Sequence, residues 1–195
     1  MNASLFPEHA PLWCACVVDP PWAQEAGGGG RGAQGHYPLL STPEVREVVR
    51  RSGMWRPHDD AHLYLWVTNT ILAEGDGHEL MRALGFRPVT VLTWTKKHAG
   101  LGQYFRGQTE HVLFGVRGQG RAPQVLTASR SEGTHWLHTV ERGEHSEKPA
   151  RSYALVEARS HGPYLSMFHR GPPPRPGWLV WGDEAVAPLE VGGRR

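Results

Sequence analysis

The chain is poor in cysteine and in long apolar stretches, and both absences exclude classes of protein. Its only cysteines among 195 residues are Cys14 and Cys16, two apart on an expected strand and hence on one face. This geometry suits neither a disulfide nor a four-ligand zinc site, so we expect reduced thiols. No apolar run approaches the roughly 18 residues of a membrane span, and the N-terminus lacks a signal-peptide pattern. We therefore expect a cytoplasmic protein without a membrane helix.

Net charge is also small. Lys and Arg number 21 against 19 Asp and Glu, so the formal charge is +2. Any nucleic-acid partner would then be held by a local basic patch rather than by the charge of the whole molecule. Candidate patches are Arg50-Arg51, Lys96-Lys97 and the group Arg117, Arg121 and Arg130, although such charges usually belong to a solvated face.

Histidine is abundant, with 12 residues, and invites a metal hypothesis. His58 and His62 are four apart, and His135 and His138 are three apart, as ligands on one helix face would be. Neither pair has a third ligand at a convincing spacing. We expect no metal site.

Length and composition indicate one soluble globular domain over residues 1–195. Apolar runs alternate with helical patterns along it. This order predicts an α/β, Rossmann-like fold, a mostly parallel sheet with helices on both faces. The expected strands are 13–18, 62–68, 88–95, 110–116, 164–169 and 178–181, and the expected helices are 41–51, 71–84 and 149–159. The first helix opens with the capping box Ser41-Thr42-Pro43-Glu44, and Gly75 and Gly77 weaken the second.

The most informative motif is Asp19-Pro20-Pro21-Trp22, directly after the first strand. Ligands bind at the carboxyl ends of strands in open α/β sheets, which is where Asp19 falls. The prolines remove two N–H donors, so we expect outward carbonyls free to accept hydrogen bonds from an exocyclic amine, with Trp22 offering a face to a stacked base. The alternative is a plain strand-ending turn with a core tryptophan.

A glycine-rich stretch over residues 27–35 follows this motif. It contains almost nothing that could pack, so we expect a mobile loop. Its position beside the motif favours a lid that orders on substrate binding. A flexible connector is the simpler alternative.

Further blocks extend the motif into a family resemblance. Together with the motif, they resemble the DPPW-type N6-adenine methyltransferases in content and in order along the chain. This is the family of the eukaryotic messenger-RNA adenine methyltransferase and its phage and bacterial relatives. The blocks that carry the resemblance are His36-Tyr37-Pro38, 63–69 (LYLWVTN), 94–97 (WTKK), 100–106 (GLGQYFR), 110–115 (EHVLFG), 145–149 (HSEKP) and 177–184 (GWLVWGDE).

The resemblance implies a class I methyltransferase with the DPPW motif N-terminal to the cofactor motifs. S-adenosyl-L-methionine would be the cofactor, and nucleic acid the substrate, with DNA favoured over RNA. The sequence leaves the oligomeric state open, a homodimer included. The implied residues are Asp19, Pro20, Pro21 and Trp22 for catalysis, Asp19, Trp66, Lys148, Arg170, Asp183 and Glu184 for the cofactor, and Tyr37, Lys96 and Glu110 for the substrate.

Three departures from the family pattern concern the cofactor side. Asp183 replaces an amide, Ser166 replaces a carboxylate expected to brace Arg170, and Pro172-Pro173 replace side chains that contact the ribose in some relatives. They keep open a second function, a catalytically silent protein of this fold that binds nucleic acid or scaffolds a partner. The intact DPPW motif argues for the enzyme.

Overall fold

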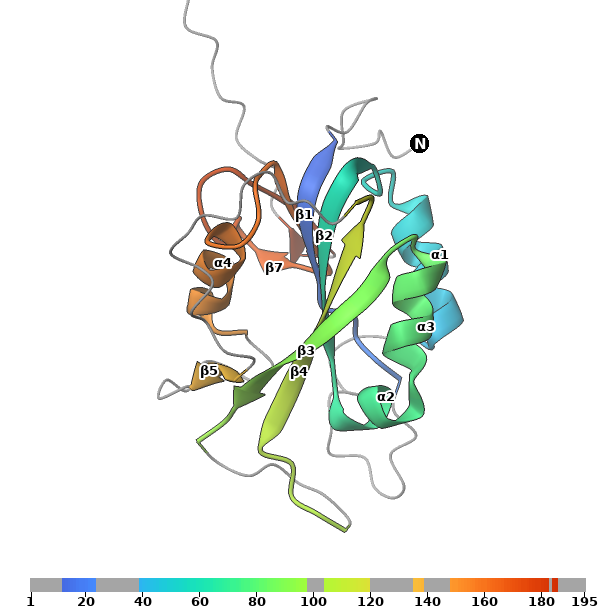
Figure 1. Cartoon of the computed structure of the whole chain (residues 1–195), viewed down its shortest axis with the longest axis vertical. Coiled ribbons are helices and arrows are strands. Elements are labelled where there is room, and N and C mark those ends of the chain that lie inside the picture. Colours follow the sequence, from blue (N-terminus) through green and yellow to red (C-terminus); the bar gives the residue numbers. More distant parts are fainter. Residues whose placement is uncertain are drawn as a thin grey trace, which may run out of the picture.

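A seven-stranded sheet with helices on both faces organises the chain (Figure 1). This computed structural model describes residues 12–23, 39–97, 104–119, 135–138, 148–182 and 184–185. The sheet has the order β5-β3-β4-β2-β1-β6-β8. Its strands are β1 (Trp13–Val18), β2 (Pro57–Val67), β3 (Arg87–Thr95), β4 (Thr109–Arg117), β5 (His135–His138), β6 (Tyr164–Met167) and β8 (Trp178–Trp181).

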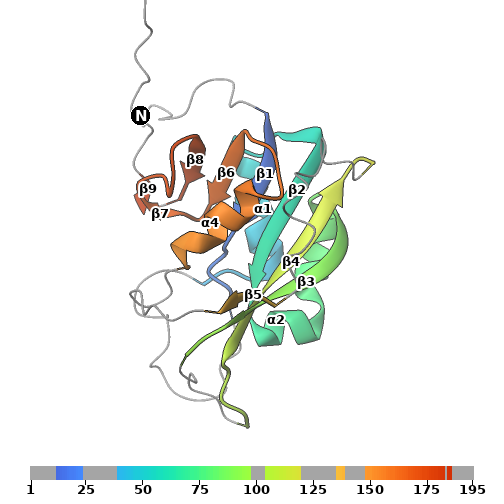
Figure 2. The same ribbon diagram turned by 60° about the vertical axis from the view of Figure 1, so that its left-hand side comes forward.

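The sheet is mostly parallel because only β4 runs against the others. It pairs antiparallel with both β2 and β3, whereas β1 pairs parallel with β2 and β6, β6 with β8, and β3 with β5. The predicted Rossmann-like α/β fold is thereby confirmed. A separate parallel pair, β7 (Arg170–Gly171) with β9 (Glu184–Ala185), lies beside it (Figure 2).

Two apolar clusters, one on each face, hold the layers together. On one face, Val45 and Val49 of α1 (Thr42–Arg51), Ile71 of α2 (Asn69–Glu74), and Leu80 and Met81 of α3 (Asp76–Ala83) pack with β1, β2 and β6. On the other face, α4 (Ala150–Glu157) packs its own apolar side chains with β1, β2 and β8. Burial on both faces explains why β1 reads as an unbroken apolar run.

The N-terminal signals of α1 act as the sequence predicts. Ser41 and Glu44 form the expected capping box, in which the backbone N–H of Ser41 donates to Glu44 at 2.8 Å. Val45 and Val49 are buried, and Val48 is half-buried.

The single helix expected over residues 71–84 is wrong. The chain forms α2 and α3 instead, separated by Gly75 in the left-handed conformation with φ of 86°. Glycine reaches this region without the steric cost that other residues meet.

Several expected boundaries also shift. Strand β2 begins at Pro57, five residues before the expected start, and β6 ends at Met167, because Phe168 takes a positive φ of 58°. Both histidine pairs lie in strands, β2 and β5, and so are not on a helix face. Among the described residues, no group of three or more His, Cys, Asp and Glu could hold a metal ion. In the same part of the chain, no helix has the length and apolarity to cross a membrane.

Candidate active site

The middle of the sheet creates the site, at the carboxyl end of β1. From β1 the chain proceeds to β2 on one side, whereas β6 lies on the other side. Strand order therefore reverses at β1, and such switch points are where open α/β sheets bind ligands. Asp19 follows β1 at this point, and its backbone N–H reaches the Met167 carbonyl at 3.4 Å. The predicted position of Asp19 is confirmed.

The turn after Asp19 is closed by backbone hydrogen bonds. Trp22 N–H donates to the Pro20 carbonyl at 2.9 Å, and Leu40 N–H donates to the Pro21 carbonyl at 2.7 Å. Ala23 N–H then donates to Leu40 at 2.8 Å. The expectation of two free carbonyls is therefore wrong. A carbonyl oxygen has two lone pairs, so Pro20 retains the capacity to accept one more bond.

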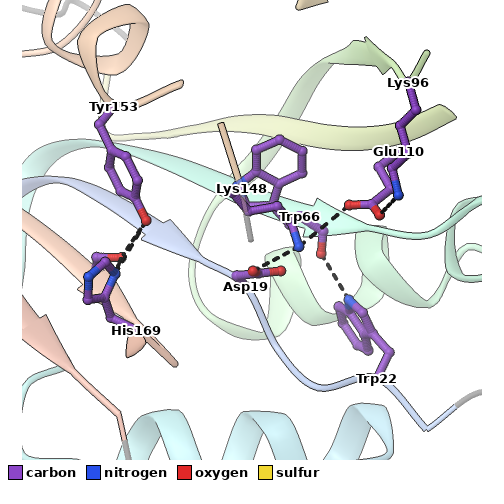
Figure 3. Close-up of polar contacts among 9 residues, drawn as sticks. Asp19, Trp22, Trp66, Lys96, Glu110, Lys148, Tyr153 and His169 are labelled. Atoms are coloured by element: carbon purple, nitrogen blue, oxygen red, sulfur yellow. Dashed lines mark hydrogen bonds and ion pairs between the residues drawn. The ribbon is translucent and has the colours of Figure 1, made fainter. Parts of the chain in front are cut away.

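Trp22 lies in the core instead of presenting a face to the surface. Its side chain is buried in the cluster beneath the sheet, and its indole N–H donates to the Trp66 carbonyl at 2.9 Å (Figure 3). A buried indole N–H needs such an acceptor. In this structure Trp22 anchors the turn to β2, and no open face is left for a base.

Lys148 is the centre of a cluster of charged side chains beside Asp19. Its ammonium lies 2.9 Å from Oδ2 of Asp19 and 3.5 Å from Oε2 of Glu110, with only 11% of its side chain exposed (Figure 3). It also lies over the Trp66 ring, 5.2 Å from the centroid. Residues far apart in sequence thus converge, because Asp19 follows β1, Glu110 opens β4, and Lys148 precedes α4.

Lys96 completes the cluster from the end of β3. It forms an ion pair with Glu110 and lies 5.0 Å from the centroid of the Trp94 ring. Register explains the pairing, because Trp94 is opposite Glu110 and the Lys96 N–H donates to the Gln108 carbonyl at 2.7 Å. Asp19, Lys148, Glu110 and Lys96 therefore alternate in charge across the end of the sheet.

Burial and charge set the ionisation of this cluster. Burial raises the pKa of Asp19, and the Lys148 ammonium offsets this only in part. Burial opposes ionisation of Glu110 too, but Lys148 and Lys96 outweigh it and lower the pKa. Burial disfavours the Lys148 cation, yet Asp19 and Glu110 hold its pKa above the ordinary value. Lys148 thus stays charged, while Asp19 is the carboxylate that takes up a proton more readily.

A polar network that sequence reasoning missed lies next to Asp19. His169 Nδ1 is 3.1 Å from Ser166 Oγ and 3.3 Å from Tyr153 Oη, and its Nε2 is 2.9 Å from the Pro172 carbonyl (Figure 3). Burial lowers the pKa of His169, although the hydrogen bond to the Pro172 carbonyl and the charge of Asp19 act in the opposite direction. Ser166, read as the loss of a carboxylate, is a buried member of this network. No sequence motif links Ser166 with Tyr153, so no signal in the sequence could have revealed their contact.

Two residues expected at the cofactor ribose come together through the small sheet. Arg170 of β7 is in register with Glu184 of β9, and the charge of Arg170 offsets a small part of the rise that burial causes in the pKa of Asp19. Gly182 packs against the backbone of His169, where a Cβ would lie 2.2 Å from the His169 carbonyl oxygen. Tyr37, Asp183 and the stretch 27–35 lie outside the described residues.

The comparisons with known proteins agree with this geometry. The MT-A70 family model matches residues 14–184. The chain belongs to the MT-A70 family. This is the family of the messenger-RNA adenine methyltransferase and its relatives, whose kind of function is S-adenosylmethionine-dependent methylation of adenine N6 on nucleic acid. A search of curated proteins gives no match.

MT-A70 methyltransferases generally use S-adenosylmethionine, and the residues present fit it. A buried ammonium at Lys148 suits a carboxylate, and the Asp19 carboxylate suits an ammonium or amine. The backbone register of β7 and β9 places Arg170 opposite Glu184, the two positions expected at the ribose. The match begins in β1 and ends at Glu184, so it includes all these positions.

Proposed function

We propose that this chain is an active S-adenosylmethionine-dependent methyltransferase that methylates adenine N6 in DNA. The observation that carries the proposal is the Asp19 carboxylate at the switch point of the sheet, 2.9 Å from the buried Lys148 ammonium. Membership of the MT-A70 family supports the reaction class.

Asp19 and Pro20 would orient the adenine amine. The N6 lone pair is delocalised into the ring, so the amine is a poor nucleophile. The Asp19 carboxylate would accept one N–H, and the remaining lone pair of the Pro20 carbonyl would accept the other. Acceptors fixed in this way draw the lone pair toward the nitrogen and favour the transition state over the ground state. Pro21 and the buried Trp22 would keep the turn in place.

The reaction also releases a proton, because an NH2 group becomes NH–CH3. Asp19 would be hydrogen-bonded to that nitrogen, and burial raises the pKa of its carboxyl. Both features suit a proton acceptor, since transfer is easier to a carboxylate with a raised pKa. Lys148 would hold Asp19 in its charged form before the reaction.

The cofactor supplies, when bound, an electrophilic methyl group on a sulfonium that leaves readily. Lys148 would hold its carboxylate, with Trp66 beside it, and Arg170, Asp183 and Glu184 would bind its ribose. Asp19 would also face its ammonium group. The positive end of α4, which begins two residues after Lys148, adds to the attraction for a carboxylate.

The substrate side would comprise Glu110, Lys96 and Tyr37. The first two open β4 and follow β3, so they lie on the hairpin next to Asp19. In duplex DNA the target base must leave the stack to reach Asp19, at a cost of a few kcal/mol.

Methyl transfer by an isosteric pair of variants tests the proposal. Wild type, Asp19→Asn and the control Asp59→Asn, whose exposed residue lies at the other end of the sheet in β2, are incubated with labelled cofactor and adenine-containing DNA or RNA. Digestion and mass spectrometry then quantify N6-methyladenine. We expect methylation of DNA by wild type and Asp59→Asn, and its loss in a folded Asp19→Asn protein.

Two results would contradict the proposal. Full activity of Asp19→Asn would remove Asp19 from the chemistry. If wild type neither transfers methyl groups nor binds the cofactor in isothermal titration, the chain is a silent scaffold of the family.

A further inference from the structure

Two aromatic side chains stand in solvent beside the site. Tyr104 is 92% exposed and Phe105 is 91% exposed, by far the most exposed large apolar residues described. They lie between β3 and β4, and the described part of this connection extends beyond α2 in both Figure 1 and Figure 2. Adjacent exposed aromatic residues reduce solubility, so their presence side by side indicates that a binding partner covers them. We call Tyr104, Phe105 and the next residue, Arg106, the aromatic tip.

The base of this tip is fixed to the body of the protein. Asn69, the first residue of α2, donates from Nδ2 to the Thr109 carbonyl at 3.2 Å. Its Oδ1 accepts from the Thr109 hydroxyl at 3.1 Å and lies 2.9 Å from His111 Nε2. Arg106 is four residues before Glu110, so at most about 14 Å of chain separates them. The tip is therefore held within a few nucleotide lengths of the charged cluster.

The charge of this connection complements a polyanion. From Lys96 to Gln108 the sequence contains three cations, Lys96, Lys97 and Arg106, and no acidic residue. Lys97 and Arg106 are exposed. The net charge of this stretch, +3 with histidine neutral, is larger than the net charge of +2 of the whole chain.

We propose that the aromatic tip, formed by Tyr104, Phe105 and Arg106, binds unpaired bases of the substrate strand next to the target adenine. Aromatic faces stack on any base, and an arginine beside them pairs with the backbone phosphate. In a duplex these faces are already occupied by neighbouring bases, so the tip selects a single-stranded or locally opened nucleic acid. The proposal rests on the function proposed above, since it names the substrate class of that site.

Binding without catalysis tests the tip independently of methyl transfer. Fluorescence anisotropy is measured with a labelled 12-nucleotide single-stranded DNA containing one adenine, with its RNA counterpart and with the DNA duplex. We expect the double variant Tyr104→Ala/Phe105→Ala to lose about 5-fold or more in affinity for the single strands, the equivalent of one stacked base. Tyr104→Phe/Phe105→Tyr should bind within about 2-fold of wild type, because both rings remain.

Arg106 and matched controls separate stacking from general effects. Arg106→Ala should flatten the salt dependence of single-strand binding by about 0.7 in log–log slope, the value for one phosphate contact. Val89→Ala, an exposed apolar position near the opposite end of β3, and Arg82→Ala, an exposed cation on α3, should leave both quantities unchanged.

Three outcomes would overturn the inference. One is single-strand affinity unchanged in Tyr104→Ala/Phe105→Ala, and another is equal weakening by Val89→Ala. The third is a wild-type dimer, seen by sedimentation, that this double variant converts to monomer, because the tip would then be a self-association surface. If the tip binds single strands but no methyl group is ever transferred, the proposed function fails while this inference stands.

Discussion

Removal of the Lys148 ammonium should destabilise the fold strongly, and more at pH 8 than at pH 5. Coulomb attraction to Asp19 at 2.9 Å and to Glu110 at 3.5 Å amounts to about 6 and about 5 kcal/mol at an effective dielectric constant of about 20. Most of this offsets the cost of burying the three charges. Breaking a buried pair by removing one partner nevertheless costs about 3–5 kcal/mol, because the other charge stays buried.

We expect Lys148→Met to cost about 3 kcal/mol, the low end of that range. Glu110 keeps Lys96 as a partner, and Asp19 can escape part of the penalty by binding a proton. Each unit by which the pKa of Asp19 rises in the variant makes protonation about 1.4 kcal/mol more favourable.

The pH dependence follows from the signs of the shifts. The lowered pKa of Glu110 stabilises the fold above its unfolded-state pKa of about 4.3, and this is lost as the pH falls through the folded value. The raised pKa of Lys148 stabilises the fold below its unfolded-state pKa of about 10.4, and is lost as the pH rises through the folded value. The raised pKa of Asp19 has the opposite sign for a carboxylate and costs stability at neutral pH. The loss in Lys148→Met should therefore be largest near pH 8 and smaller at pH 5.

Urea unfolding followed by circular dichroism at both pH values measures the effect. The control Lys97→Met removes an exposed ammonium near Lys96 and should change stability by less than about 0.5 kcal/mol. The double variant Lys148→Met/Asp19→Asn should recover part of the loss, because it also removes the carboxylate left without its partner. A Lys148→Met protein that loses less than about 1 kcal/mol at pH 8, or equally at both pH values, would refute the reasoning.

Two further predictions concern buried side chains near β1. Trp22→Phe should lower the free energy of unfolding in urea by about 1–3 kcal/mol, because it removes the hydrogen bond to the Trp66 carbonyl and leaves space in the core. Unchanged stability with lost methyl transfer would instead mean that Trp22 contacts the target base. Cys16 is buried and its pKa is raised well above the ordinary value, so a chromogenic disulfide reagent at pH 8 should not modify it in the native protein, whereas both thiols should react in urea. Rapid modification of both Cys14 and Cys16 without urea would contradict this.

The sequence by itself determined the local features of this protein. An unbroken apolar run predicted β1, and Ser41 with Glu44 predicted the start of α1, because these signals involve neighbours in the chain. The order of motifs predicted the family, and the apolar run before Asp19 predicted its position at a strand end. Gly75 was read as a weak point of one helix, whereas its φ of 86° makes it the boundary between two.

Contacts between distant segments were decided only by the tertiary structure. That the Pro20 and Pro21 carbonyls are occupied, and that Trp22 is buried, depends on where Leu40 and Trp66 lie. The bridge from Asp19 through Lys148 to Glu110 joins residues separated by up to 129 positions, as their numbers show. No local pattern encodes such a contact, because it arises where the end of β1 and the start of the antiparallel β4 meet at one edge of the sheet, next to the segment that leads into α4.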